Sequence, residues 1–130
     1  MTDKELIDLA TQVRRKAYAP YSHYAVGAAI LGKSGRTYTG CNVENAVYSL
    51  TICAERAALF KAISENEREF ETLAVVTSNG GSPCGSCRQV LAEFGLDIRV
   101  LIATPEQLVA ETRVADLLPR AFGRQDLPES

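Results

Sequence analysis

Short apolar segments that suit β-strands alternate along this chain with segments that suit helices, and this alternation restricts the fold more than any other feature. Residues 3–18 have the apolar spacing of an amphipathic helix. The stretches 24–31 and 37–41 flank the turn sequence Lys-Ser-Gly-Arg, which predicts a strand hairpin. Residues 53–63 are rich in alanine and predict a second helix.

The rest of the chain continues the alternation. The expected elements there are strands at 72–78, 97–103 and 108–112 and helices at 84–94 and 114–118. This order predicts an α/β protein: a three-layer α/β/α sandwich, in which helices cover both faces of a mixed, mostly parallel, five-stranded sheet. We expect residues 1–130 to form a single domain whose polar end, 123–130, is a flexible tail.

Charge and composition exclude some classes of partner. The net charge is −2 at pH 7, and the densest basic cluster, residues 14–16, lies in a helix that also carries acids. We therefore expect no nucleic-acid partner. No apolar run reaches the roughly 20 residues that cross a membrane, and the N-terminus lacks the apolar stretch of a signal peptide. We expect no membrane partner and a cytoplasmic location.

Three of the four cysteines lie in two short motifs at expected helix starts. Cys-Ala-Glu begins at Cys53, and Pro-Cys-Gly-Ser-Cys covers residues 83–87. Each motif alone is ambiguous, because a single cysteine is often a core residue and Cys-x-x-Cys serves redox as well as metal chemistry. A redox site has no use for a third thiol followed by a carboxylate. Together the motifs match the pattern of zinc nucleobase deaminases, in which ligand-x-Glu precedes Pro-Cys-x-x-Cys.

The same cysteines predict the metal site. Cys53, Cys84 and Cys87 are expected to hold one Zn²⁺ per subunit and to leave a fourth position open, as catalytic zinc requires. Cys41 could close a four-cysteine site, but it lies on the outgoing hairpin strand, and we interpret it as a small buried residue. Three thiolates leave the site negative, so Arg56 is expected to donate hydrogen bonds to a thiolate sulfur and to offset this charge.

Glu55 is the predicted catalytic residue. It lies two positions after a ligand, on another side of the helix, and can reach the open position without binding the metal. We expect it to carry protons from the attacking water to the pyrimidine N3 and to the leaving amino group. An isolated glutamate would more simply be a surface ion-pair partner, which the flanking cysteines disfavour.

Several segments resemble the cytidine deaminase family, in particular its small, homotetrameric, three-cysteine branch. They keep the order and spacing of the family and extend to residues 118–122. The segments are Ala17–Ser22, Val26–Ala29, Gly40–Asn45, Cys53–Arg56 and Ser82–Gln89. The resemblance implies zinc-dependent hydrolytic deamination of cytidine and 2′-deoxycytidine to uridine and 2′-deoxyuridine, with release of ammonia, in pyrimidine salvage.

The resemblance also implies substrate contacts. Asn42 and Glu44, which share a face of an extended segment, would bind the ribose 3′-hydroxyl. Tyr24 takes the place of the aromatic residue that lies against the base, where phenylalanine is usual, and the backbone around Ala54 would hold the pyrimidine. Phe122 would reach from a neighbouring subunit over the active site, so that the homotetramer completes each site.

Other interpretations remain open at this point. A deaminase of the blasticidin S type has the same cysteine motifs, although the Asn-x-Glu element at residue 42 favours a free nucleoside. An enzyme that edits polynucleotides is disfavoured by the absence of a basic surface, and a structural zinc or RNA-binding module would leave Glu55 without a role. Tyr48 fits a subunit contact and a core position equally well. His23, the single histidine, is expected to be exposed and not a ligand.

Overall fold

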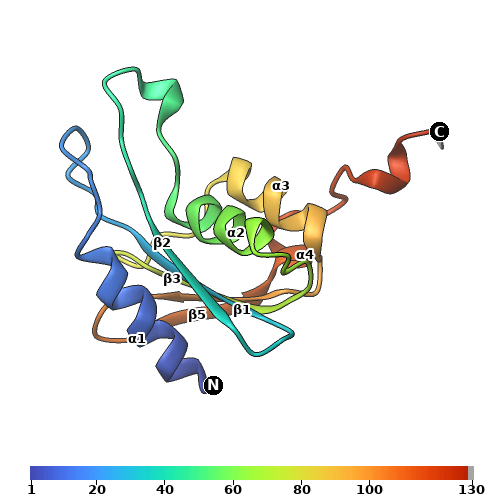
Figure 1. Ribbon diagram of the computed structural model, residues 1–130, viewed down its shortest axis with the longest axis horizontal. Helices are drawn as coiled ribbons and strands as arrows, with labels where there is room; N and C mark the ends of the chain where they lie inside the picture. The colour runs from blue at the N-terminus through green and yellow to red at the C-terminus, as the bar shows by residue number, and fades with distance from the viewer. Residues whose placement is uncertain (129–130) are drawn as a thin grey trace.

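A five-stranded sheet forms the centre of the computed structural model, which describes residues 1–128 (Figure 1). The strand order is β2-β1-β3-β4-β5. The strands are β1 (Gly27–Gly32), β2 (Thr37–Cys41), β3 (Phe70–Val76), β4 (Arg99–Ala103) and β5 (Leu108–Arg113). The helices are α1 (Asp3–Arg14), α2 (Ala54–Ser64), α3 (Gly85–Phe94) and α4 (Val114–Leu117), with 3₁₀ turns at Tyr48–Leu50 and Arg124–Asp126.

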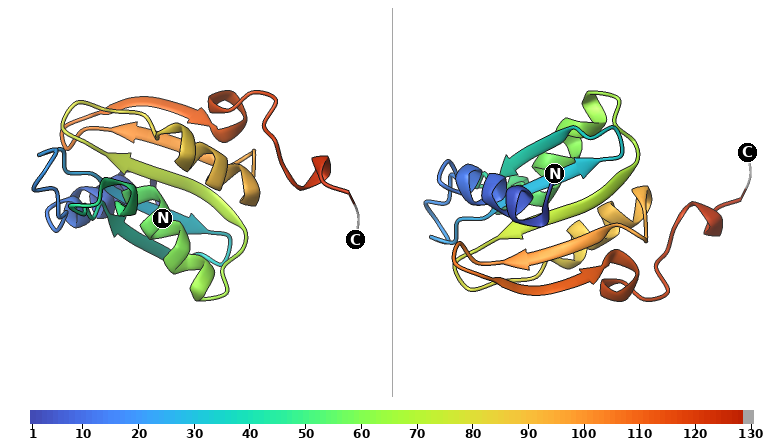
Figure 2. Two further views of the ribbon diagram at one scale, coloured as in Figure 1. Left: turned by 90° about the horizontal axis from the view of Figure 1, so that it is seen from above. Right: turned by 90° about the horizontal axis from the view of Figure 1, so that it is seen from below.

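The two faces of the sheet carry different helices, as both views in Figure 2 show. On one face, Leu6 and Ala10 of α1 pack against alternate residues of β1, β3 and β4. On the other face, α2 and α3 cover the intervening residues of the same strands. Because successive strand side chains point to opposite faces, strands that are covered on both sides must be apolar throughout. All six residues of β1 are accordingly buried. The predicted α/β class and the mixed five-stranded sheet are confirmed.

The prediction of a mostly parallel sheet is wrong. Only the pair β3–β4 is parallel, and the pairs β1–β2, β1–β3 and β4–β5 are antiparallel. Helix α2 does connect two strands of the same direction, β2 and β3, but β1 lies between them. The alternation of helices and strands therefore predicted that α2 connects two parallel strands. It did not predict that β1 lies between those strands.

The first helix is shorter than predicted, since α1 ends at Arg14 and not at Tyr18. The backbone of Tyr18 instead pairs with the segment after β2: its N–H donates to the carbonyl of Asn42 at 3.0 Å, and its carbonyl accepts from the N–H of Glu44 at 2.9 Å. The next strand also begins later than expected, at Gly27. The residues between α1 and β1 therefore belong to neither element, and they lie against the segment around Asn42.

The ends of the described chain add two findings. Residues Arg124–Asp126 form a 3₁₀ turn within the tail predicted over 123–130, whose last two residues lie outside the described part. No helix in the described residues is both long and apolar enough to cross a membrane.

Helix α2 lies very close to the sheet at Gly40. A Cβ atom on Gly40 would come within 2.5 Å of the backbone nitrogen of Ala58 and 2.8 Å of the carbonyl of Ala54. Only glycine permits this approach, because any side chain would push the helix away from β2. The contact fixes the position of the first turn of α2 relative to the sheet. This turn contains Glu55 and directly follows Cys53, the N-cap residue.

Candidate active site

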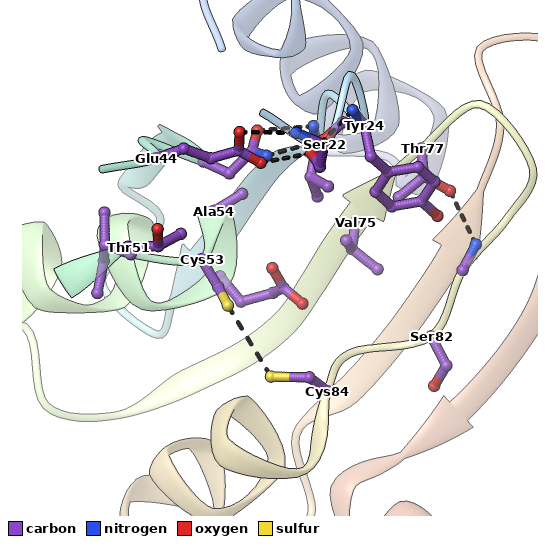
Figure 3. Close-up of a pocket in the computed structure, with 15 residues that line it drawn as sticks. Ser22, Tyr24, Glu44, Thr51, Cys53, Ala54, Val75, Thr77, Ser82 and Cys84 are labelled. Atoms are coloured by element: carbon purple, nitrogen blue, oxygen red, sulfur yellow. Dashed lines mark hydrogen bonds between the residues drawn. The ribbon is translucent and has the colours of Figure 1, made fainter. Parts of the chain in front are cut away.

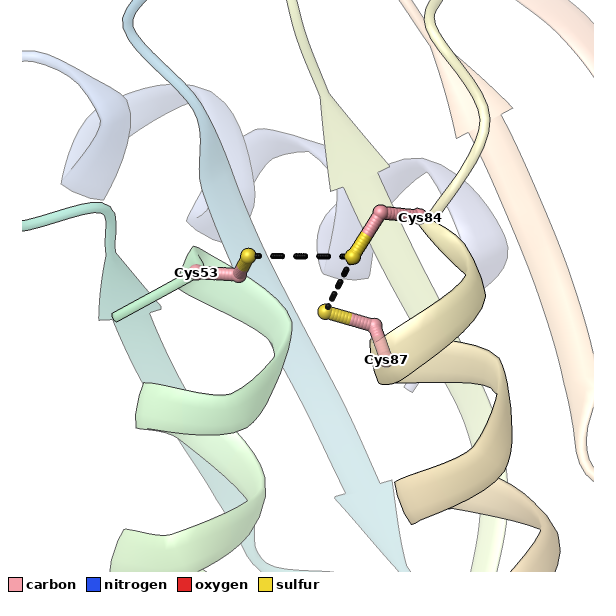
Figure 4. A group of neighbouring side chains, drawn as sticks. All are labelled: Cys53, Cys84 and Cys87. Carbon is pink, nitrogen blue, oxygen red and sulfur yellow. Dashed lines mark hydrogen bonds between the residues drawn. The ribbon is translucent and has the colours of Figure 1, made fainter. Parts of the chain in front are cut away.

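The three predicted metal-binding cysteines come together where α2 and α3 begin. Cys53 is the N-cap residue of α2, Cys84 is the N-cap residue of α3, and Cys87 lies in the first turn of α3. The Sγ atoms of Cys53 and Cys84 are 3.9 Å apart, and those of Cys84 and Cys87 are 3.4 Å apart (Figure 4). All three sulfur atoms lie within 4.8 Å of one another.

This spacing fits a tetrahedral zinc ion. With Zn–S bonds of about 2.3 Å, tetrahedral geometry places sulfur atoms about 3.8 Å apart. This is close to the separations of 3.9 Å and 3.4 Å that Cys84 makes with Cys53 and Cys87. Within residues 1–128 no other group of three histidine, cysteine or carboxylate side chains is as closely gathered. Cys41 is not part of the cluster. It is also partly exposed, so its interpretation as a buried residue is wrong.

The surroundings favour the thiolate of Cys53, whereas the hydrogen bond with Cys53 and burial raise the pKa of the Cys87 thiol. Arg56 donates a hydrogen bond from Nη2 to the Sγ of Cys53 at 3.3 Å. The thiol of Cys87 and the guanidinium of Arg56 lower the pKa of Cys53 to about 5, although burial opposes this. The Nε of Arg56 is the one buried side-chain polar atom of the described residues that lacks a hydrogen-bond partner. Such an unpaired donor beside three thiols suits a site that gains negative charge when a metal is bound.

Glu55 lies beside the thiols without joining their cluster. This residue is only 5% exposed, and it lines the same pocket as Cys53 and Cys84. Burial is the main cause that raises the pKa of Glu55, to about 7, and the neighbouring Cys53 adds to the effect. A carboxyl group whose pKa lies near neutrality can both accept and release a proton at working pH.

A pocket of about 250 Å³ opens next to the thiols. Figure 3 shows Cys53 and Cys84 on one side of it, Glu44 and Ser22 on another, and the ring of Tyr24 on a third. The remaining lining residues are mostly apolar or small. They are Val26, Asn42, Thr51, Ile52, Ala54, Glu55, Val75, Thr77, Gly81 and Ser82. The structure therefore brings the predicted substrate residues Tyr24, Asn42, Glu44 and Ala54 into one cavity with the thiols.

Backbone contacts hold Asn42 and Glu44 in place. The Oδ1 atom of Asn42 accepts from the N–H of Val26 at 2.9 Å, and its Nδ2 atom donates to the carbonyl of Tyr24 at 2.8 Å. Glu44 accepts from the N–H of Tyr21 at 2.9 Å and of Ser22 at 3.1 Å, as well as from the Ser22 hydroxyl. The Ser22 hydroxyl is the largest cause that lowers the pKa of Glu44. The carboxylate of Glu44 is therefore ionised at neutral pH, and these hydrogen bonds fix its position.

Three other aromatic or titratable residues lie outside this pocket. Phe122 is 58% exposed, and its carbonyl accepts from the side-chain amide of Gln89 at 2.8 Å. Tyr48 is 74% exposed and packs edge to face on Tyr21, with 5.8 Å between ring centroids. The core position considered for Tyr48 is therefore excluded. His23 is exposed.

Sequence reasoning missed two residues that shape the site. Ser22 fixes the carboxylate of Glu44, as described above. Arg88 donates to the carbonyl of Pro83 at 2.8 Å, to the carbonyl of Leu117 at 2.8 Å and to the hydroxyl of Ser82 at 2.8 Å. Arg88 thus ties the loop before Cys84 to the end of α4. Its position directly after Cys87 could have indicated a role near the cluster, but no sequence pattern indicates which backbone carbonyls an arginine reaches.

The fold and the site together define a zinc hydrolase built on an α/β sheet. Residues 1–104 match the family model described as the cytidine and deoxycytidylate deaminase zinc-binding region. The chain therefore belongs to the cytidine and deoxycytidylate deaminase family, and zinc is its cofactor. The family resemblance found in the sequence is confirmed.

Individual relatives agree with this assignment. The chain is 48% identical over 130 residues to the cytidine deaminase of Sporosarcina psychrophila, with 98% of this chain and 96% of that protein covered. It superposes on the crystal structure of cytidine deaminase from Burkholderia pseudomallei with a TM-score of 0.90 and 46% identity, over 94% of this chain and 100% of that one. A blasticidin-S deaminase from Bacillus cereus is more distant, at 31% identity over 132 residues, with 94% of this chain and 93% of that protein covered.

The contact between Arg56 and Cys53 generates a prediction about metal affinity. Arg56→Ala removes the cation that offsets the thiolates, so we expect zinc affinity to fall about tenfold to a hundredfold while the fold is retained. Competition with a chromogenic chelator measures the affinity, and circular dichroism follows the fold. Lys61→Ala, at an exposed position of the same helix, serves as the control and should bind zinc as the unmodified protein does. Unchanged zinc affinity in Arg56→Ala would contradict the role of this residue.

Proposed function

We propose that this protein hydrolyses the 4-amino group of cytidine and 2′-deoxycytidine, which gives uridine or 2′-deoxyuridine and ammonia. One observation carries the proposal: three thiols converge on one point beside the buried carboxyl of Glu55, at one side of a pocket large enough for a nucleoside. The family assignment and the cytidine deaminases among the relatives support the same reaction.

Cys53, Cys84 and Cys87 would hold the zinc ion. Two of the three thiols belong to N-cap residues, and the third lies in the first turn of a helix, where the partial positive charge of the helix favours thiolates. When bound, zinc with three protein ligands lowers the pKa of water in its open position and so provides a nucleophile near neutral pH.

Glu55 would move the protons. Its carboxylate takes a proton from the attacking water and donates it to N3 of the pyrimidine, which makes C4 more electrophilic. After attack at C4, the same group takes the remaining proton from the new C4 hydroxyl and passes it to the amino nitrogen. The C4 carbonyl then forms as the C4–N bond breaks and ammonia leaves. The raised pKa of Glu55 suits both directions of transfer.

The other side of the pocket would hold the sugar and the base. Asn42 and Glu44 retain hydrogen-bonding capacity beyond their backbone contacts, because each carboxylate or amide oxygen accepts more than one hydrogen bond. Both would bind the ribose 3′-hydroxyl. The ring of Tyr24 would lie against the pyrimidine, and the backbone at Ala54 would bind the base edge. The absence of a 2′-hydroxyl contact in this scheme is consistent with acceptance of both nucleosides.

The proposed role of Glu55 predicts an inactive enzyme that keeps its metal. Glu55→Gln has almost the same shape but cannot accept a proton, so we expect turnover to fall by about 10²–10⁴-fold with the zinc content unchanged. Loss of the cytidine absorbance band and release of ammonia measure turnover, and metal analysis measures zinc. The control is Glu93→Gln on the exposed side of α3, which should remain active.

The outcomes of this assay separate the candidate functions. Near-normal turnover in Glu55→Gln would rule out the proton shuttle. Zinc binding by the unmodified protein without turnover of cytidine would indicate a structural zinc module. Turnover of blasticidin S in preference to cytidine would indicate the related antibiotic deaminase.

We further propose that the protein is a homotetramer in which neighbouring subunits complete each active site. Apolar side chains are exposed along the segment between β2 and α2 and at the end of the chain, which suits burial between copies. These residues are Val43, Val47, Tyr48, Leu50 and Phe122. Figure 1 shows the segment as a loop that projects from the body of the molecule. Phe122 would cover the pocket of a neighbour, since it does not line the pocket of its own chain.

The tetramer predicts that a separated subunit is nearly inactive. Gel filtration with light scattering should find four chains in the active protein. Phe122→Ala should raise the KM for cytidine several-fold, because the pocket loses one apolar wall. An active monomer, or an unchanged KM in Phe122→Ala, would contradict this arrangement.

The proposed location is the cytoplasm and the proposed pathway is pyrimidine salvage. All four cysteines are free thiols in the structure, which fits a reducing compartment. The substrates and products of the proposed reaction are free nucleosides, which salvage enzymes interconvert.

A further inference from the structure

Tyr24 makes a hydrogen bond that a phenylalanine at this position could not make. Its hydroxyl donates to the Oδ1 atom of Asn79, and the two oxygen atoms are 2.6 Å apart. Tyr24 precedes β1, whereas Asn79 lies in the loop between β3 and α3, 55 residues further along the chain. The bond therefore joins Tyr24, which lines the pocket, to the loop that contributes Gly81 and Ser82 to the pocket lining.

The loop around Asn79 is shaped to receive the phenol oxygen. A Cβ atom on Gly81 would lie 2.4 Å from the Tyr24 hydroxyl oxygen, so a side chain at residue 81 would displace it. Gly80 has a φ of +77°, a backbone conformation that glycine adopts without strain. The sequence Asn-Gly-Gly thus supplies an acceptor, a tight turn and an empty space for the hydroxyl.

Contacts with Thr77 and β5 hold the loop that carries Asn79, the acceptor, in place. The hydroxyl of buried Thr77 lies 3.4 Å from the Oδ1 atom of Asn79 and accepts from the N–H of Gly81 at 2.8 Å. On its outer side the turn lies against β5, since a Cβ on Gly80 would come within 2.7 Å of Val109. The loop is consequently held between Val109 and Tyr24.

This loop leads directly to the thiol cluster. Ser82 lines the pocket, and Cys84 follows two residues later as the N-cap of α3. Tyr24 also lines the pocket, opposite the segment that carries Cys53 (Figure 3). A hydrogen bond from Tyr24 to the loop thus connects a wall that faces the substrate with the segment that delivers Cys84.

We propose that the hydroxyl of Tyr24 is a positioning group, which binds Asn79 and thereby holds the substrate-facing ring and the Cys84 loop in one geometry. The part that concerns the substrate rests on the proposed function. The part that concerns the loop rests only on the thiol cluster. Without the hydroxyl, the ring still fills its place but can move relative to the metal site, so the pyrimidine binds less well and the loop opens more easily.

The test is a double-mutant cycle on the zinc-loaded full chain, with Tyr24→Phe, Asn79→Ala and the two combined. A hydrogen bond of this kind predicts that each single substitution raises the KM for cytidine about threefold to tenfold, with kcat changed by less than about twofold. The rate of zinc release to the chelator 4-(2-pyridylazo)resorcinol should rise about twofold to fivefold in each. The combined variant should be no worse than either single variant, because all three lack the same bond.

Two further variants separate positioning from general damage. Asn79→Asp keeps an oxygen acceptor and should restore KM and zinc release to within about twofold of the unmodified protein. Tyr18→Phe removes the hydroxyl of an exposed tyrosine outside the pocket and should change neither quantity.

The proposal is overturned if Tyr24→Phe keeps both the original KM and the original zinc release, or if the effects of the two single substitutions multiply in the combined variant. A protein that does not deaminate cytidine at all would refute the proposed function alone. The zinc-release cycle would then still decide whether Tyr24 and Asn79 are coupled.

Discussion

Two helix N-termini must meet on one face of the sheet, and the rest of the site depends on that constraint. Helices α2 and α3 follow different strands, and their first residues are about thirty positions apart in the sequence. They can place three sulfur atoms within 4.8 Å only because both pack on the same face of β1, β3 and β4. The close contact at Gly40 removes the space in which α2 could shift. Packing of apolar side chains thus sets the geometry of a polar site.

The site in turn concentrates groups that are unfavourable for stability. A carboxyl group is buried beside sulfur atoms that become anionic, and a buried guanidinium nitrogen lacks a partner. Each of these features costs free energy of folding unless a metal and a substrate are bound. Enzymes commonly keep such costs at their active sites, because the same burial that destabilises a charged group tunes its pKa for proton transfer. Here burial raises the pKa of Glu55 to about 7, which suits the proton transfer proposed for this residue.

Most of the architecture could be predicted from local sequence, whereas contacts between distant segments could not. The apolar runs around Ile30, Ala74 and Leu101 predicted buried strands, and the three cysteines predicted the position of the site because their spacing carries chemical information. The prediction of mostly parallel strand pairs was wrong, because the apolar periodicity of a segment does not indicate that β1 lies between β2 and β3. The bonds from Arg88 to Pro83 and from Tyr24 to Asn79 depend on the tertiary fold, and no local pattern predicts them.

The whole site depends on three sulfur atoms that surround one zinc ion and leave one position open. X-ray absorption at the zinc edge of the purified protein measures this arrangement directly. We expect three sulfur scatterers at about 2.3 Å and one lighter scatterer at about 2.0 Å. A shell of four sulfur atoms, which would bring in Cys41 or a cysteine from another subunit, or a shell without sulfur would contradict it.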